Sequence, residues 1–364
     1  MRAGPAVARV DQVTTATESQ PVPAAPATKP RFAFVDNARF WVMVMVVMSH
    51  PLYHFISLAP GRAIYYWLNL LMMPAFAMLS GYISRNFSGT PKEIQRTIST
   101  LVIPYLLVEP IYQVLQRHYT GSPDPYMLLS PKWVAWWLAA LFVWRFSTPI
   151  WRHLRHPIIV SVLISLLAPL TEVPNVISMP KVLGMLPFYV IGMFMTIDRF
   201  QALATKRNRI LSAVFLVGVG VACALYSTHW DVSWTKWRHR YDEAALNAGA
   251  LEGIAHRGLF ILIGVLMSWA IISLVSRRES WMSRMGERTL YCYLLHGFIV
   301  FFLLHETHVF ATLRAMGNTG LLITLATAVV AALLLMTRPV AVLFRPLFES
   351  KLDWAFKPRE RLPR

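Results

Sequence analysis

The stretch from Arg39 to His50 most constrains the fold, because it is almost wholly apolar between two polar ends. Residues 40–48 read FWVMVMVVM, which is typical of a membrane-spanning helix. An α-helix advances about 100° per residue, so Arg39 and His50 share one face, about 16 Å apart along the axis. Asp36 lies one turn before Arg39. Polar groups of this kind are costly in lipid, so we expect this face to line a bundle interior or a wet cavity.

The rest of the chain has the composition of a polytopic membrane protein. Of its 364 residues, 56% are hydrophobic and only 15% are charged, and the mean hydropathy is +0.47. The apolar runs predict an all-α membrane bundle of about ten transmembrane helices. The spans cover approximately residues 34–54, 64–84, 98–116, 133–149, 157–171, 181–197, 210–227, 258–275, 289–305 and 319–337.

Lysine and arginine residues indicate the orientation of these spans. The net charge of +17 would suggest a nucleic-acid partner in a soluble protein. Here, with the N-terminus placed inside, the inside segments hold 25 of the 35 Lys and Arg residues and the outside segments hold nine. This excess predicts a multi-pass protein of the cytoplasmic membrane with both termini cytoplasmic. The partner is then the lipid bilayer, and nucleic acid is rejected.

The chain is expected to form one membrane domain, residues 31–340, between two tails. Residues 1–30 are polar and lack an apolar signal-peptide core, which predicts a disordered cytoplasmic tail. Residues 341–364 are expected to form a basic cytoplasmic tail. Cys223 and Cys292 lie in apolar runs and are interpreted as small hydrophobic residues, so neither a disulfide nor a metal site is expected.

The longest outside segment, about residues 228–257, is rich in tryptophan. Trp230, Trp234 and Trp237 could form an interfacial aromatic belt or a lip that stacks on sugars, and the pattern favours the belt.

Three motifs occur together in this chain. They are DNAR at residues 36–39 followed by ten residues and His50, MMPAFAMLSGYISR at 72–85, and YCYLLH at 291–296. The set resembles the acyltransferase 3 family of integral-membrane O-acyltransferases. The first two motifs look most like its fucose 4-O-acetylase-like branch. The resemblance covers about residues 31–340.

The resemblance implies a reaction. An acyl group, usually acetyl, is expected to move from cytoplasmic acetyl-CoA to a hydroxyl of a cell-envelope or extracellular carbohydrate. The family often has an Arg-x-x-Arg pair in its first cytoplasmic loop, and Lys92 and Arg96 are the nearest match here. A second basic run, containing Arg152 and Arg155, could bind the phosphates of coenzyme A or simply anionic lipid.

His50 and Arg39 are the candidate catalytic residues. A sugar hydroxyl becomes a good nucleophile when a base removes its proton, and neutral imidazole suits this task. His50 could instead accept the acetyl group itself, and the sequence leaves both mechanisms open. Arg39 is a fixed cation that could hold a CoA phosphate or the donor carbonyl, or could pair with Asp36. Its distance from His50 assigns the two to different parts of a tunnel.

The remaining candidates for substrate binding have alternative explanations. Ser80, beside Gly81, is better explained by close helix packing, although its hydroxyl could still donate to substrate. Glu109 could line the acceptor path or form an ion pair with Arg39 or Arg145. The candidate substrate-binding residues are Asp36, Ser80, Tyr82, Glu109 and His296.

A polytopic transporter or flippase of a lipid-linked glycan or small solute is the competing function. Such proteins also place charges in a cavity, often between inverted repeats with paired broken helices. Proline predicts broken segments near Pro74 and Pro104, but no matching pair occurs in the second half of the chain. The sequence therefore favours the acyltransferase over the transporter.

Overall fold

The computed structural model describes residue 4, residues 33–121 and residues 126–349. Apart from Gly4, the tail predicted for residues 1–30 lies outside these ranges, as do residues 350–364 of the predicted C-terminal tail. The described chain is all-helical, which confirms the predicted fold class. Its helices are α1 Ala33–Leu52, α2 Ala59–Ser84, α3 Pro91–Thr97, α4 Ile103–Thr120, α5 Trp136–His153, α6 Pro157–Leu167, α7 Met179–Met193, α8 Ile197–Ala202, α9 Lys206–Tyr226, α10 Ala250–Leu274, α11 Trp281–Gly286, α12 Thr289–Glu306, α13 Val309–Ala315, α14 Asn318–Leu335 and α15 Arg338–Phe348.

Each of the ten predicted spans coincides with helix, although not all of them are equally apolar. Within the described ranges, seven helical segments are long and apolar enough to cross a membrane. The predicted spans in α1, α5 and α6 are outside this set, so the number ten stays a prediction. The seven segments are Ala59–Ser84, Pro91–Thr120, Val176–Met193, Lys206–Tyr226, Ala250–Leu274, Thr289–Glu306 and Asn318–Leu335.

The breaks expected at proline residues are absent from these helices. Pro74 lies inside α2, which is assigned as one helix. Residues 91–120 also form one helical run, in which a π-helical turn, Ile98–Val102, joins α3 to α4. Pro104 stands in the first turn of α4, where its missing N–H would have no partner within the helix anyway. The structure therefore corrects the prediction of broken segments.

Helix α1 occupies the inside of the bundle. It contacts α2, α11, α12 and α14, and most of its residues are buried. Helices α2 and α7 approach especially closely, because a Cβ atom at Gly81 would overlap the carbonyl oxygen of Tyr189 and one at Gly192 would overlap that of Met78. The packing explanation for the Ser80–Gly81 pair is thus supported by the contact that Gly81 makes with α7.

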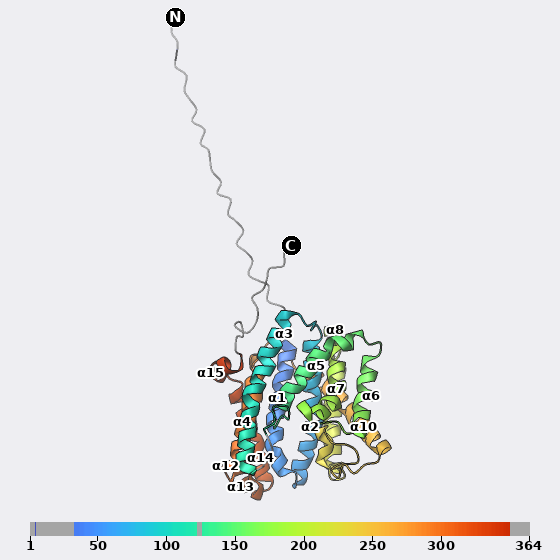
Figure 1. Ribbon diagram of the computed structural model, residues 1–364, viewed down its shortest axis with the longest axis vertical. Helices are drawn as coiled ribbons and strands as arrows, with labels where there is room; N and C mark the ends of the chain where they lie inside the picture. The colour runs from blue at the N-terminus through green and yellow to red at the C-terminus, as the bar shows by residue number, and fades with distance from the viewer. Residues whose placement is uncertain (1–3, 5–32, 122–125, 350–364) are drawn as a thin grey trace. The chain divides into compact units, whose positions relative to one another are not determined.

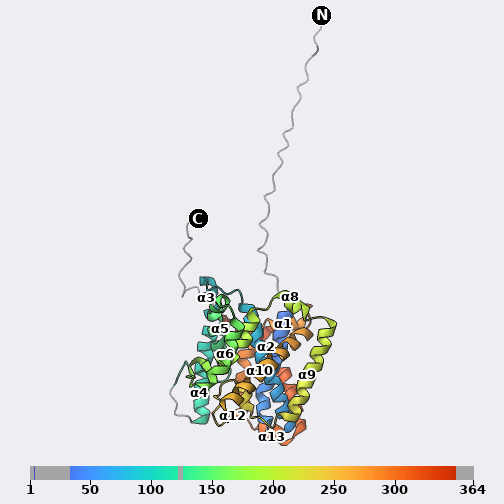
Figure 2. The same cartoon turned by 90° about the vertical axis from the view of Figure 1, so that its right-hand side faces the viewer.

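The two ends of the bundle carry different elements. Helices α3 and α8 lie at one end and α13 lies at the other (Figures 1 and 2). The predicted orientation places the end with α3 and α8 in the cytoplasm. The segment expected to begin the C-terminal tail at residue 341 continues helix α15 as far as Phe348.

The tryptophan-rich segment after α9 folds back onto the bundle. Trp234 and Trp237 are only 5% and 3% exposed. The ring of Trp230 lies 5.8 Å from that of Phe260, and the ring of Trp234 lies 5.1 Å from that of His256, both on α10. These side chains form the packed interior of the segment, and the choice between an interfacial belt and a lip that stacks on sugars stays a prediction.

Candidate active site

The structure brings together two histidines that the sequence singled out separately. His50 lies in the last turn of α1, and His296 lies in the middle of α12. The centroids of their rings are 5.0 Å apart, with an angle of 58° between the ring planes. His296 is only 1% exposed, whereas His50 is half-buried. His50 is therefore the more accessible member of the pair.

The hydrogen bonding of His296 fixes its tautomer. Nδ1 of His296 lies 2.9 Å from the carbonyl oxygen of Cys292. Because a carbonyl oxygen only accepts, Nδ1 must donate, and Nε2 of the neutral ring carries the lone pair. Nε2 is buried and has no hydrogen-bond partner in the described part of the chain. Buried polar atoms are normally satisfied, so an orphan of this kind is a sign of function.

A charged side chain, Lys181 of α7, belongs to the surroundings of the two neutral histidines. Its ammonium group acts electrostatically on His50 and lies 4.4 Å from the centroid of the Trp136 ring. Sequence reasoning counted Lys181 only as an outside charge that marks orientation. The available signal was its position at the start of an apolar run, where a charged residue often marks a site.

Tyr112 of α4 is a second residue that sequence reasoning missed. It is fully buried, its ring stacks on Phe298 with centroids 4.3 Å apart, and its hydroxyl has no partner among the described residues. A Cβ atom at Gly297 would overlap this hydroxyl. The glycine therefore admits a phenol oxygen against the backbone of α12, one residue after His296.

Arg39 contacts the same helix as His50, as the predicted common face requires. Its Nη2 atom donates to Oγ1 of Thr289 over 2.8 Å, at the start of α12. Its Nη1 atom lies 3.4 Å from Oδ1 of Asp36. Arg39 thus contacts the start of α12, and His50 contacts its middle. The predicted pairing of Arg39 with Asp36 is also present.

Asn37 has a structural explanation that the motif alone did not reveal. It is completely buried, and its amide nitrogen donates to the carbonyl oxygens of Ser276 and Arg278 over 2.9 and 3.0 Å. Its amide oxygen accepts from the hydroxyl of Ser283 over 2.7 Å. Asn37 therefore fastens the start of α1 to the connection between α10 and α11.

Tyr82 and Ser80 lie in the last turns of α2, away from the histidine pair along the bundle. Tyr82 is 2% exposed, and the guanidinium carbon of Arg85 lies 3.8 Å from its ring centroid. Its hydroxyl is buried and unpartnered within the described ranges. Ser80 is half-buried.

Glu109 binds neighbouring amides rather than an arginine. Its Oε1 atom accepts from Nε2 of Gln113 over 2.7 Å, and its Oε2 atom accepts from the backbone N–H of Lys132 over 2.9 Å. Gln113 in turn exchanges hydrogen bonds of 2.8 and 2.9 Å with the backbone of Met127. Glu109 thus fixes the segment before α5 against α4, and neither Arg39 nor Arg145 is its partner.

The basic residues assigned to the donor lie at the end of the bundle that carries α3. Lys92, Arg96 and Arg155 are exposed. Arg152 donates to the carbonyl oxygen of Phe87 over 2.5 Å, which ties the end of α5 to the loop after α2. Arg145, also on α5, donates to Oγ of Ser84 over 3.3 Å and interacts electrostatically with Arg96. A cationic surface therefore surrounds this loop.

Comparison with known proteins gives one match. The family profile described as an acyltransferase domain matches residues 32–337, which include every helix described above from α1 to α14. Searches of curated proteins and of solved structures found no match.

Proposed function

The chain belongs to the acyltransferase 3 family, and from this premise we propose that it moves an acetyl group from cytoplasmic acetyl-CoA to a hydroxyl of a cell-envelope or extracellular carbohydrate. Its family makes it a membrane acyltransferase. The acetyl group, the CoA donor and the carbohydrate acceptor are parts of the proposal. So is its place in the fucose 4-O-acetylase-like branch, which rests on the motifs at residues 36–39 and 72–85.

The pair formed by His50 and His296 is the observation that carries the proposal. His50, the more accessible member, removes the proton of the acceptor hydroxyl as its oxygen attacks the acetyl carbonyl carbon. The new C–O bond forms, the C–S bond breaks, and CoA leaves as a thiolate that takes up a proton. His296 offers its unpaired Nε2 atom as an acceptor for a second hydroxyl of the carbohydrate, which would orient the substrate. The alternative, in which His50 carries the acetyl group covalently, uses the same pair.

The donor side of the proposal uses the cationic end of the bundle. Arginine recognises phosphate through paired N–H donors, and lysine adds positive charge. Arg39 lies between this end and His50 and would contact the donor on its way to the histidines. The proposed CoA-binding residues are Lys92, Arg96, Arg152 and Arg155.

The proposed orientation puts the donor end in the cytoplasm. The excess of Lys and Arg in the connections at this end supports it. The protein would then be a multi-pass protein of the cytoplasmic membrane with both termini inside, and would pass the acetyl group through the bundle to the opposite side.

The test follows labelled acetyl groups. Membranes that contain the protein are incubated with acetyl-labelled CoA and the envelope glycan of a producing strain, and label in the glycan is measured. We expect His50→Ala to lower transfer by a factor of about 10² to 10⁴. The control is His305→Ala, because His305 lies on α12, the helix of His296, but stacks on Tyr119, with ring centroids 4.7 Å apart.

The possible outcomes separate the parts of the proposal. Equal labelling by wild type and by a folded His50→Ala variant would remove His50 from the reaction. No labelling by wild type, with the native acceptor present, would contradict acetyl transfer from CoA. Movement of a solute without any acyl donor would point instead to a transporter.

A further inference from the structure

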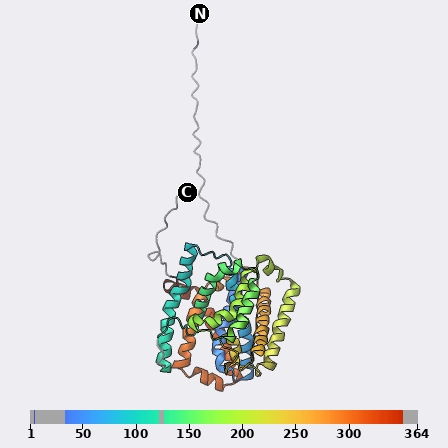
Figure 3. The ribbon, with the colours of Figure 1, turned by 45° about the vertical axis from the view of Figure 1, so that its right-hand side comes forward.

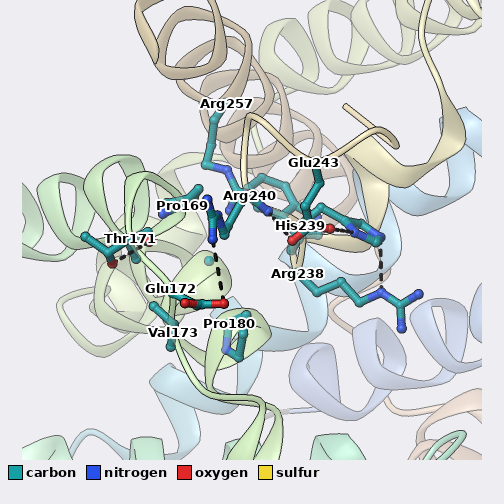
Figure 4. Close-up of a pocket in the computed structure, with 13 residues that line it drawn as sticks. Pro169, Thr171, Glu172, Val173, Pro180, Arg238, His239, Arg240, Glu243 and Arg257 are labelled. Atoms are coloured by element: carbon teal, nitrogen blue, oxygen red, sulfur yellow. Dashed lines mark hydrogen bonds and ion pairs between the residues drawn. The ribbon is translucent and has the colours of Figure 1, made fainter. Parts of the chain in front are cut away.

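A second site lies at the end of the bundle opposite α3. It is a pocket with a volume of about 320 Å³, shown in Figure 4. The connection between α6 and α7, the start of α7, the segment 237–243 and one residue of α10 form its walls. The lining residues used below are Glu172, Gly184, Trp237, Arg238, Glu243 and Arg257.

Arg257 is the unusual member of this pocket. Its side chain extends from α10 toward the other lining residues (Figure 4) and is only 3% exposed. Its Nη1 atom is buried without a hydrogen-bond partner, and no carboxylate pairs with it in the described chain. The rings of Trp237 and Tyr241 lie 5.4 and 5.8 Å from its guanidinium carbon. Aromatic faces attract a cation but accept few of its five N–H donors.

Glycine at position 184 makes room for this guanidinium. A Cβ atom there would lie 2.9 Å from Nη1 of Arg257 and 2.7 Å from the carbonyl oxygen of Trp237. The indole nitrogen of Trp237 is also buried and, in the described ranges, has no acceptor. The pocket wall therefore contains two buried N–H donors without acceptors.

The acidic residues near the pocket are engaged elsewhere. Glu243 binds His239 over 2.6 Å and the backbone N–H of Arg240 over 3.0 Å. Asp242 binds the guanidinium of Arg240 over 2.9 and 2.5 Å, and Glu172 lies 3.8 Å from the same group. These carboxylates neutralise the rim and leave the charge of Arg257 available to a ligand.

The pocket is linked to the histidine pair through helix α7. Gly184 follows Lys181 by less than one helical turn of α7, and Lys181 acts electrostatically on His50. Arg238, another lining residue, acts electrostatically on Lys181 in turn. Because the pocket lies at the end opposite α3, a ligand held by Arg257 would lie on the side of the bundle away from the donor end.

We propose that this pocket binds an anionic group, a carboxylate or a phosphate, on the acceptor carbohydrate. Arg257 and the indole N–H of Trp237 donate to its oxygen atoms, and Arg238 adds positive charge at the mouth. The inference rests on the proposed function in one respect, which is that the ligand is the acceptor of the acyl group. It adds a substrate class: carbohydrates with an acidic group are preferred over neutral ones.

The test measures binding in the absence of any acyl donor. The full-length protein in detergent is titrated with three probes of similar size: a glucuronic acid tetrasaccharide, maltotetraose phosphorylated at one end, and neutral maltotetraose. We expect at least one acidic probe to bind about 10- to 100-fold more tightly than the neutral one, which is the range for hydrogen bonds to a charged group. The acidic probe that binds more tightly identifies carboxylate or phosphate as the source of the charge.

Variants then assign this preference to Arg257. Arg257→Gln should abolish it, and Gly184→Ala, which pushes on the guanidinium, should weaken it. Arg314→Gln is the matched control, because it removes an exposed arginine near the same end, on α13. If Arg257→Gln does not fold, Arg257→Lys replaces it and should reduce the preference by losing paired donors.

Two results would overturn the inference. One is equal binding of all three probes by wild type, and the other is an acidic preference that survives in the Arg257 variants. Failure of acetyl transfer in the labelling experiment would leave this binding result standing, because no donor is used here. Conversely, transfer to neutral glycans alone would support the proposed function and contradict the acidic pocket.

Discussion

Helices α1 and α9 differ in opposite directions in hydropathy and in burial within the bundle. The apolar window of α9 has a mean hydropathy of 2.0, yet only 11% of it is buried. Helix α1 is absent from the set of strongly apolar spans, yet most of its residues are buried among α2, α11, α12 and α14. Figures 2 and 3 show α9 at the edge of the bundle. In a membrane, α9 would present its apolar surface to lipid, whereas α1 keeps its polar side chains inside the bundle, where they can take part in chemistry.

The comparison predicts that polar substitutions are most damaging where α1 meets α12. We expect His296→Gln to lower acetyl transfer by a factor of about 10² or more while the protein stays folded. The reason is that the variant removes the unpaired imidazole nitrogen opposite His50. His305→Gln, farther along the same helix, should retain activity in the same labelling assay, and equal losses in both variants would show a general effect on α12.

Asn37 and Asn208 provide a matched pair for stability. Asn37→Ala should lower the free energy of unfolding by about 2–4 kcal/mol, because it leaves several buried groups unsatisfied. Asn208→Ala, at the start of α9, removes one bond of 3.0 Å to the carbonyl oxygen of Ala202 and should cost about 1 kcal/mol or less. Thermal unfolding in detergent, followed by tryptophan fluorescence, measures both. Equal losses of unfolding free energy in the two variants would contradict the conclusion that the hydrogen bonds of Asn37 hold the start of α1 in place.

Glycine substitutions extend the comparison to packing. Gly81→Ala should destabilise the protein by about 1–3 kcal/mol, because its new Cβ atom would overlap the backbone of α7. Gly218→Ala, on α9, has open space around the added atom and should stabilise by up to about 1 kcal/mol through helix propensity. The same unfolding measurement applies. A stabilising effect of Gly81→Ala would show that α2 and α7 are less closely packed than described.

The smallest expected effect is the pH dependence of stability that comes from Asp231, in the segment that follows α9. Partial burial acts to raise the pKa of Asp231, but hydrogen bonds from Ser233 and the charges of Lys236 and Arg62 outweigh it and hold this pKa below its ordinary value. A carboxyl with a lowered folded pKa stabilises fully above its unfolded pKa of about 3.9. We therefore expect a loss of stability as the pH falls below about 4, and a slightly smaller loss in Asp231→Asn, because other carboxyl groups with lowered pKa values contribute in both proteins. Unfolding midpoints between pH 6 and pH 3 provide the measurement.

The sequence predicted the positions of the helices better than the contacts between them. Hydropathy located the long helices but not the short ones α3, α8, α11 and α13, and a single helix sufficed to place Arg39 and His50 on one face. The contact of His50 with His296 depends on how α1 packs against α12, which no local pattern contains. Lys181 carried the signal of a charge at the start of an apolar run, but its effect on His50 depends on how α7 packs in the bundle.

The tryptophan segment shows a different limit of sequence reasoning. Aromatic residues near a membrane interface suit a belt or a packed loop equally well, because both environments combine apolar and polar contacts. The return of the segment onto α10 depends on tertiary packing, which no local pattern contains. The roles of Ser80, Tyr82 and the donor-side cations remain predictions, because their chemistry depends on ligands rather than on local structure.

The π-helical turn at Ile98–Val102 sets the rotation of α3 relative to α4 about the axis of the helical run 91–120. A π turn adds one residue to a helix, so the segments before and after it are rotated by about 100° relative to an unbroken α-helix. Deleting one residue there would turn Arg96 away from Arg145 and leave Glu109 and Tyr112 in their places. The number of residues in this one turn therefore sets the direction in which the basic side chains of α3 point relative to Glu109 and Tyr112 of α4. This direction does not depend on which charged residues α3 carries.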